Sequence, residues 1–197
     1  MSAADSGAVP GEDGLLRCGW ANTGTDYRHY HDTEWGRPVR GDAALFERLS
    51  LEAFQSGLSW ITILRKREAF RTAFAGFDPA AVAAFDAADR RRLLADPGIV
   101  RNAAKIDAVI SNARALLDLP AGESLEGLLE GYRAPAGRPA PRALDDVPAS
   151  TPESAALARE LKKRGFRFVG PTTAYAMLQA TGYVNDHLAD CWVRSGG

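Results

Sequence analysis

The chain has 197 residues, of which 46% are hydrophobic and 25% charged, and this ordinary globular composition excludes a largely disordered protein. The formal net charge of -1 excludes a protein that coats nucleic acid through a large excess of basic residues. Any contact with DNA must therefore be local.

Residues 1–16 are small, polar and slightly acidic, and we expect them to form a flexible tail before a single domain at 17–197. They lack the basic start and apolar run of a secretory signal. No uncharged apolar segment approaches the length of about 20 residues that spans a bilayer, so we expect a cytoplasmic protein without membrane contact. Thiols there stay reduced, which favours metal binding over a disulfide for Cys18 and Cys191.

Helical periodicity begins at Asp42, which is suited to cap a helix. Gly57 is expected to bend or end this segment. The apolar residues that recur at three- and four-residue intervals are Leu45, Phe46, Leu49, Ala53, Phe54, Trp60, Ile61 and Leu64.

A second helical segment follows Asp78 and Pro79, because Asp can cap a helix and Pro suits its first turn. It ends at the Pro97-Gly98 pair. Residues 99–119 then show an amphipathic pattern typical of a long surface helix.

Residues 120–152 are rich in proline and turn signals and predict a loop with one short helix near Leu128. A helix then begins at Thr151-Pro152-Glu153 and runs to Lys163, and another begins at Pro171. No alternating strand pattern or internal repeat is present. The sequence therefore predicts an all-α fold with two helical lobes.

Four residues could bind a metal ion: Cys18, His31, His187 and Cys191. The last two are four positions apart, which would place them on one face of a helix. A Cys2His2 set suits a structural zinc ion with no open position for a catalytic water. Spacing alone leaves inert packed residues as an equal alternative. His29 is expected at the surface.

The segment from Leu161 to Tyr175 places Gly165 and Gly170 between two helical stretches. Backbone amides at such a hairpin and at the start of the next helix can bind a phosphate. The expected DNA-backbone contacts are Gly165, Gly170, Thr172, Lys163 and Arg167, with further positive charge from Lys162 and Arg164. The alternative is a plain helical turn with a solvated basic end.

Aromatic residues gather in the first third of the chain, at Trp20, Tyr27, Tyr30, Trp35 and Trp60. Most aromatic residues simply build a core. Glu52, however, lies on the apolar face of the helix that begins at Asp42. A buried carboxylate must be neutralised, hydrogen-bonded or reserved for a ligand. Hydrogen bonds from backbone amides are the alternative to a ligand. If the ligand is a base that has been rotated out of a DNA helix, Trp60 is the first candidate to stack on it.

Together these motifs resemble the DNA-3-methyladenine glycosylase I family. The residues that carry the resemblance are Arg17–Trp20, Tyr30–Gly36, Leu51–Thr62, Phe77–Pro79, Arg101–Lys105, Asn112–Arg114, Lys162–Thr173 and Asn185–His187. The resemblance implies a fold of the helix-hairpin-helix glycosylase superfamily, with the hairpin element at about 153–183. It also implies that a structural Zn2+ joins the two ends of the chain through the four Cys and His residues.

The same resemblance places Glu52 at the base-recognising position, with Tyr30, Trp20, Trp60 and Tyr27 as base-binding aromatic residues. It implies a monomeric enzyme that flips 3-methyladenine out of alkylated double-stranded DNA and hydrolyses the N-glycosidic bond without strand cleavage, with free 3-methyladenine as product. The family lacks the catalytic aspartate of many relatives, so Asp186 is not assigned that role. A zinc-stapled DNA-binding module without catalysis is the alternative.

Overall fold

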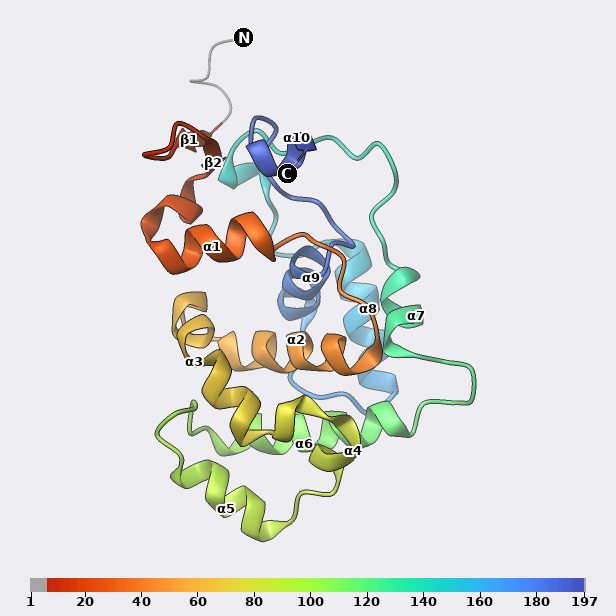
Figure 1. Ribbon diagram of the computed structural model, residues 1–197. Coiled ribbons are helices and arrows are strands. Elements are labelled where there is room, and N and C mark those ends of the chain that lie inside the picture. Colours follow the sequence, from red (N-terminus) through yellow and green to blue (C-terminus); the bar gives the residue numbers. More distant parts are fainter. Residues whose placement is uncertain (1–6, 197) are drawn as a thin grey trace. The chain divides into compact units, whose positions relative to one another are not determined.

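The computed structural model describes residues 7–196 and is mostly helical, as the sequence predicts (Figure 1). The α-helices are α1 (Thr25–Thr33), α2 (Asp42–Gln55), α3 (Trp60–Ala73), α4 (Pro79–Ala83), α5 (Ala87–Ala95), α6 (Ala103–Leu117), α7 (Leu125–Glu130), α8 (Pro152–Lys163), α9 (Pro171–Ala180) and α10 (Trp192–Gly196). Short 3₁₀ helices are η2 (Gly19–Thr23), η3 (Ala75–Phe77) and η4 (Leu144–Asp146). Within the described range, no helix combines the length and apolar character that crossing a bilayer requires.

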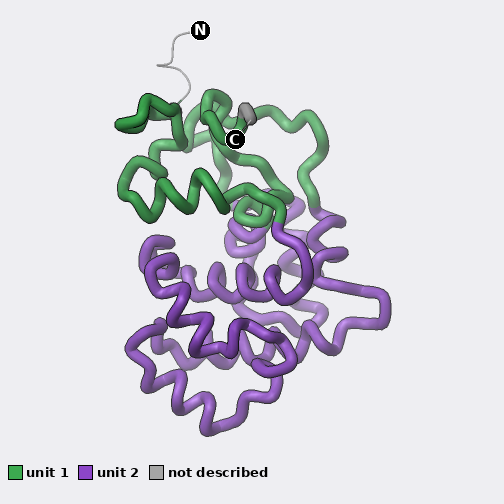
Figure 2. Tube along the Cα trace, in the orientation of Figure 1, with its two compact units in different colours: residues 1–38, 133–149, 178–197 green, residues 39–132, 150–177 purple. Residues whose placement is uncertain are grey.

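The chain divides into two compact units (Figure 2). The first unit comprises residues 1–38, 133–149 and 178–197, so it is assembled from three separate segments. The second unit comprises residues 39–132 and 150–177 and contains most of the helices. Each unit contains part of the set of predicted functional residues, and each is described by itself.

The first unit begins with a β-hairpin where the sequence predicts a flexible tail over residues 1–16. Strand β1 (Ala8–Pro10) pairs antiparallel with β2 (Leu16–Cys18). The turn is closed by the Gly11 N–H, which donates to the Leu15 carbonyl at 2.9 Å. The strands are too short to show an alternating pattern, which is why the sequence did not reveal them. For residues 1–6 the prediction lies outside the described part of the chain.

The core of the second unit is built around α2, and its centre is aromatic. Phe54 packs against Phe70 with ring centroids 4.6 Å apart, and Phe74 stacks on Phe77 at 5.4 Å. The predicted break at Gly57 is confirmed, since this residue has a φ of 79° between the end of α2 and the start of α3. The residues of α2 that are no more than 1% exposed are Leu45, Phe46, Leu49, Ser50, Leu51, Ala53 and Phe54.

Helix α6 is a core helix, and the prediction of a surface helix for residues 99–119 is wrong. It packs against α2, α4 and α5, and Ile106, Val109 and Ala113 are fully buried. Small residues such as Ala108 widen the apolar stripe, so that three neighbouring helices can approach. A sequence pattern of one apolar face therefore underestimated the burial.

Several helix starts agree with the sequence and one does not. Asp78 caps α4 by accepting from the Ala81 N–H at 2.7 Å, and Thr151 caps α8. Asp42 does not cap its own helix. Its carboxylate instead accepts from the Glu126 N–H of α7 at 3.0 Å, while the Glu126 carboxylate accepts from the Gly41 N–H at 2.8 Å. This exchange fastens the start of α2 to the short helix predicted near Leu128.

Lys105 closes the other end of α2. Its ammonium group donates to the carbonyl of Phe54 at 2.9 Å and to that of Ser56. Burial lowers the pKa of this ammonium group, whose residue is only 7% exposed. Because these carbonyls have no helical partner, Lys105 supplies the bonds that the last turn of α2 would otherwise lack.

Replacing Lys105 by Met is expected to lower the free energy of unfolding by about 2–4 kcal/mol, because the buried Phe54 carbonyl and the Ser56 carbonyl both lose a charged donor. Urea denaturation followed by circular dichroism measures this. Lys66→Met is the matched control, since Lys66 also donates to two carbonyls, those of Pro97 and Gly98, from a less buried position. Equal losses in the two variants would contradict a special role for Lys105 at the end of α2.

Candidate functional site

The predicted site residues are divided between the two units. The first unit contains Cys18, His31, His187 and Cys191 together with the aromatic residues Trp20, Tyr27 and Tyr30. The second unit contains Glu52, Trp60 and the hairpin at 162–173. His29 is exposed, as expected.

The four candidate metal ligands come together in one buried cluster of the first unit. Cys18 ends β2, His31 lies in the last turn of α1, and the other two residues precede α10. The potential ligand atoms of all four side chains lie within 4.8 Å of one another. His187 and Cys191 do not share a helix as predicted, because a turn closed by the Cys191 N–H and the Leu188 carbonyl brings them together.

The spacing inside this cluster fits a tetrahedral metal ion. His31 Nε2 and His187 Nδ1 are 3.2 Å apart, and Cys191 Sγ lies 3.4 and 3.6 Å from these two atoms. Cys18 Sγ lies 4.0 Å from His187 Nδ1. Zn–N and Zn–S bonds of about 2.0 and 2.3 Å in a tetrahedron would separate two nitrogens by about 3.3 Å and a nitrogen and a sulfur by about 3.5 Å.

In each of the two imidazoles, the nitrogen that points away from the cluster contacts a hydrogen-bond acceptor, and this contact determines which nitrogen faces the cluster. His31 Nδ1 lies 2.8 Å from the Asp32 carboxylate, and His187 Nε2 lies 3.1 Å from the Trp35 carbonyl. Both outer nitrogens therefore carry the hydrogen, and the two inner nitrogens face each other with lone pairs. The hydrogen bond with Cys191, together with burial, raises the pKa of the Cys18 thiol. A buried cation would satisfy all of these atoms.

Trp20 connects the aromatic residues of the first unit to the Cys/His cluster. Its ring meets Tyr27 edge-on at 5.7 Å and lies 6.5 Å from Tyr30, measured between centroids. It also meets His31 at 5.1 Å and Trp35 at 5.2 Å. Tyr30 is buried, whereas Trp20 and Tyr27 are half-buried. The ring positions therefore depend on the packing around His31.

Glu52 lies in the interior of α2 and is only 6% exposed. Within the described residues its carboxylate accepts no hydrogen bond, so backbone amides do not satisfy it there. Burial raises its pKa to about 7, although the positive charge of Arg48 one turn earlier acts in the opposite direction. A carboxylate in this state is available to a ligand that brings positive charge or hydrogen-bond donors.

Trp60 is the first residue of α3 and is half-buried. It follows the turn at Gly57, and Ser59 and Thr62 stabilise the start of the helix through a hydrogen bond between their hydroxyls at 2.9 Å. Glu52 and Trp60 are thus carried by consecutive helices on either side of one tight turn.

The predicted hairpin between α8 and α9 is present. Gly165 has a φ of 89°, and the non-glycine residue Phe168 has a φ of 56°. Residues 162 and 165–170 line a cavity of about 550 Å³. Within the described residues, the amides of Phe168, Val169 and Gly170 donate to no protein acceptor. Such amides suit an anion.

Asn112 of α6 holds this hairpin in place. Its Nδ2 donates to the Arg167 carbonyl at 3.1 Å, and its Oδ1 accepts from the Arg167 N–H at 2.7 Å. The sequence predicts no role for Asn112, since a polar residue on an amphipathic helix gives no indication of its partner. Its full burial is the structural sign of this role.

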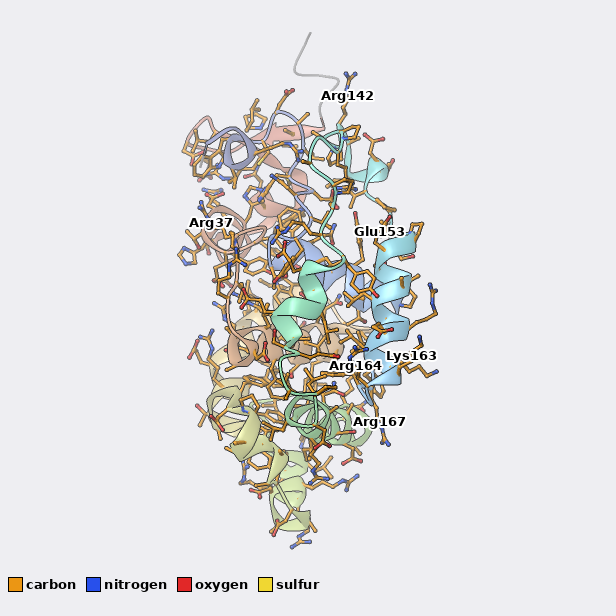
Figure 3. The ribbon with its side chains drawn as sticks, turned by 90° about the vertical axis from the view of Figure 1, so that its right-hand side faces the viewer. Arg37, Arg142, Glu153, Lys163, Arg164 and Arg167 are labelled. Atoms are coloured by element: carbon orange, nitrogen blue, oxygen red, sulfur yellow. The ribbon has the colours of Figure 1, made fainter. Side chains whose placement is uncertain are left out.

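The basic residues of the hairpin differ in their availability. Figure 3 shows Lys163, Arg164 and Arg167 following one another at the end of α8 that lies away from Glu153. Arg164 pairs with Glu123 at 2.8 Å and with Glu160, so its charge is used within the protein. Lys163 lies 3.5 Å from Glu160 but is 75% exposed, and Arg167 is also exposed. Lys163 and Arg167 are therefore better placed for solvent anions.

Comparison with known proteins extends these observations. The methyladenine glycosylase family matches residues 20–195. DNA-3-methyladenine glycosylase 1 of Escherichia coli (strain K12) is 46% identical over 180 residues, which cover 90% of this chain and 96% of the relative.

Two solved structures are also similar to this chain. The crystal structure of a 3-methyladenine DNA glycosylase I superposes with a TM-score of 0.84 at 47% identity and covers 89% of this chain and 98% of that one. The structure of 3-methyladenine DNA glycosylase I from Staphylococcus aureus, which concerns its recognition of 3-methyladenine, has a TM-score of 0.82 at 35% identity and covers 90% of this chain and 95% of that one. The chain belongs to the methyladenine glycosylase family.

Proposed function

We propose that this protein excises 3-methyladenine from alkylated double-stranded DNA by hydrolysing the N-glycosidic bond, without cutting the strand. The observation that carries this proposal is the buried Glu52 carboxylate, which accepts no hydrogen bond within the described residues of a chain of this family. The products are free 3-methyladenine and an abasic site. We expect the protein to act as a monomer.

The chemistry of the lesion explains why one carboxylate suffices. Methylation at N3 makes the adenine cationic, so the base leaves as a neutral molecule and positive charge develops on the sugar. Little acid catalysis is needed, and water completes the hydrolysis. Ionised Glu52 favours the cationic base over an unmodified purine and orients it by hydrogen bonding to its edge. Extrusion of the lesion costs a few kcal/mol, and less where methylation has weakened the pair.

Aromatic residues are proposed to hold the extruded base. Trp60 stacks on it, and Trp20, Tyr30 and Tyr27 supply further aromatic contacts. Stacking contributes about 1–3 kcal/mol per base, and attraction between a cation and a ring face adds on the order of 0.5–2 kcal/mol. The second contribution is absent for neutral adenine, so it selects for charged lesions.

The hairpin between α8 and α9 is proposed to bind the DNA backbone as a helix-hairpin-helix element. The backbone amides of Phe168, Val169 and Gly170, with that of Thr172, would meet phosphate oxygens, and Lys163 and Arg167 would add charge. The predicted contact through the Gly165 amide is wrong, because this amide donates to the Lys162 carbonyl at 3.1 Å, and Gly165 instead provides the turn. These contacts set the position of the enzyme on the duplex and do not read sequence.

The cluster of Cys18, His31, His187 and Cys191 is proposed to hold a structural Zn2+. The distances and the facing lone pairs support this assignment. Two thiolates and two imidazoles complete a tetrahedron, which leaves no position for a catalytic water. The ion would therefore stabilise the first unit and take no part in the hydrolysis.

Chromatography of free bases tests the activity. Methylated duplex DNA incubated with the purified zinc-loaded protein is expected to release 3-methyladenine and to keep its strands intact until alkali is added. Glu52→Gln removes the charge with little change in shape and is expected to lower excision by about 10²-fold, the scale for losing one electrostatic stabiliser. Duplex binding and zinc content should stay near the wild-type values.

Glu47→Gln is the matched control for this variant, because it makes the same change on the same helix at a residue paired with Arg71 at 2.8 Å. It should excise at nearly the wild-type rate. No release of any methylated base by folded, metal-bound wild-type protein would reject the glycosylase proposal. Unchanged kinetics in Glu52→Gln would reject the role of Glu52 alone.

The pH dependence of excision should show the titration of Glu52. Its pKa of about 7 means that the carboxyl group is largely protonated below that pH and ionised above it. Because the ionised form favours a cationic base, kcat/KM is expected to rise as pH increases through about 7 and then to level off. Single-turnover assays between about pH 5.5 and 8.5 would measure the profile. Glu52→Gln should lack the rise, and a wild-type rate that falls over this range would contradict the assignment.

Zinc removal should destabilise the protein. A chelator is expected to lower the melting temperature by at least about 10 °C, which corresponds to several kcal/mol at about 2–4 °C per kcal/mol. Added Zn2+ should restore it. Cys191→Ser should reproduce the loss, whereas His29→Ala, which changes an exposed histidine outside the cluster, should not. Identical melting curves with and without chelator, at a measured zinc content near zero, would reject the site.

A further inference from the structure

A chain of hydrogen-bonded charges leads from the N-terminal hairpin to the Cys/His cluster. Its centre is Arg17 of β2, which is only 2% exposed. The guanidinium group donates to the Asp32 carboxylate from Nε at 3.0 Å and from Nη2 at 2.8 Å. It donates to Asp13 from Nη1 and Nη2, both at 2.7 Å. Two carboxylates therefore grip one buried guanidinium group.

Asp32 continues the chain to the cluster. The carboxylate oxygen that accepts from Arg17 Nε at 3.0 Å also lies 2.8 Å from His31 Nδ1. This contact leaves Nε2 of the same ring as the atom that faces His187 and Cys191. Hydrogen bonds therefore run without interruption from Asp13 through Arg17 and Asp32 to His31.

The hairpin contributes to the cluster by two routes. Cys18 directly follows Arg17 in β2, and its sulfur accepts from the Leu188 N–H at 3.4 Å. Asp13 lies in the turn between the strands, where its carboxylate also accepts from the Leu15 N–H at 3.2 Å. The family match begins at residue 20, so the strands and turn of this hairpin precede the matched region.

We propose that Asp32 is a positioning residue for the metal ligand His31, and that the hairpin at residues 8–18 braces it through Asp13 and Arg17. This inference rests on the proposed zinc site. Carboxylates that accept from a ligating histidine fix its tautomer and ring orientation and increase its basicity. Arg17 holds Asp32 in one rotamer, and Asp13 with the Leu15 carbonyl accepts from the remaining guanidinium donors, which fixes the orientation of Arg17.

Metal affinity is the first measurement, made by competition between the full-length protein and a chromophoric chelator for Zn2+. Asp32→Ala is expected to weaken binding by about 10–100-fold, the usual cost of losing such a partner. Asp32→Asn should recover part of this loss, because its amide oxygen can still accept from Nδ1. Asp13→Asn should weaken binding by less than about tenfold, since it loosens Arg17 but leaves Asp32 in place.

Glu12→Gln is the matched control for the hairpin. It removes one carboxylate charge beside Asp13, but its side chain is 93% exposed and its ion pair with Arg28 is long, at 3.8 Å. Its zinc affinity should equal that of the wild type. A loss in this variant equal to that in Asp13→Asn would show a general charge effect and overturn the bracing role.

Spectroscopy distinguishes a role of Asp32 in orienting the His31 ring from a general effect on the stability of the protein. Long-range ¹H–¹⁵N NMR of the zinc-bound protein should show His31 protonated at Nδ1, and the Nδ1 resonance should shift in Asp32→Ala. The absorption bands of the Co2+-substituted protein should change with it. Wild-type affinity and spectra in Asp32→Ala would overturn the inference. If the wild type binds neither Zn2+ nor Co2+, the metal site and this inference fail together, while the base-release assay still reports separately on the glycosylase function.

Discussion

The first unit depends on bringing four buried, electron-rich atoms together from segments far apart in the sequence. Two nitrogens and a sulfur lie 3.2–3.6 Å from one another, and the two nitrogens present lone pairs that a buried cation would satisfy. The outer hydrogen bonds to Asp32 and to the Trp35 carbonyl keep both rings turned inward. The packing of Trp20 against His31 then ties an aromatic surface to this same arrangement.

Glu52 is a buried carboxylate inside a helix that is otherwise ordinary in its sequence and packing. The neighbouring positions Leu51, Ala53 and Phe54 are apolar and buried, and both ends of α2 are fastened, by Glu126 and by Lys105. The helix therefore tolerates a carboxylate whose ionised form is disfavoured without a ligand. Such a local conflict inside an otherwise consistent element is typical of a functional position.

Local signals made much of this structure predictable, and non-local contacts account for most of what was missed. The sequence predicts the caps at Asp78 and Thr151 and the break at Gly57, because each of these features depends only on residues a few positions away. Asp42 caps a helix 84 residues away, and the burial of α6 depends on three neighbouring helices. The four residues of the Cys/His cluster could be named, but the turn that pairs His187 with Cys191 could not.

The near-zero net charge constrains how such an enzyme can find its substrate. Arg164 is held by Glu123 and Glu160, so the hairpin offers anions chiefly its backbone amides and a few exposed cations. Fewer phosphate contacts mean weaker and less salt-dependent binding to undamaged DNA. Discrimination must then come from the extruded base itself. Under the proposed function, the Glu52 carboxylate is ionised most easily when a cation enters, and the ring of Trp60 attracts the same charge. These two groups would provide that discrimination without tight binding to the rest of the duplex.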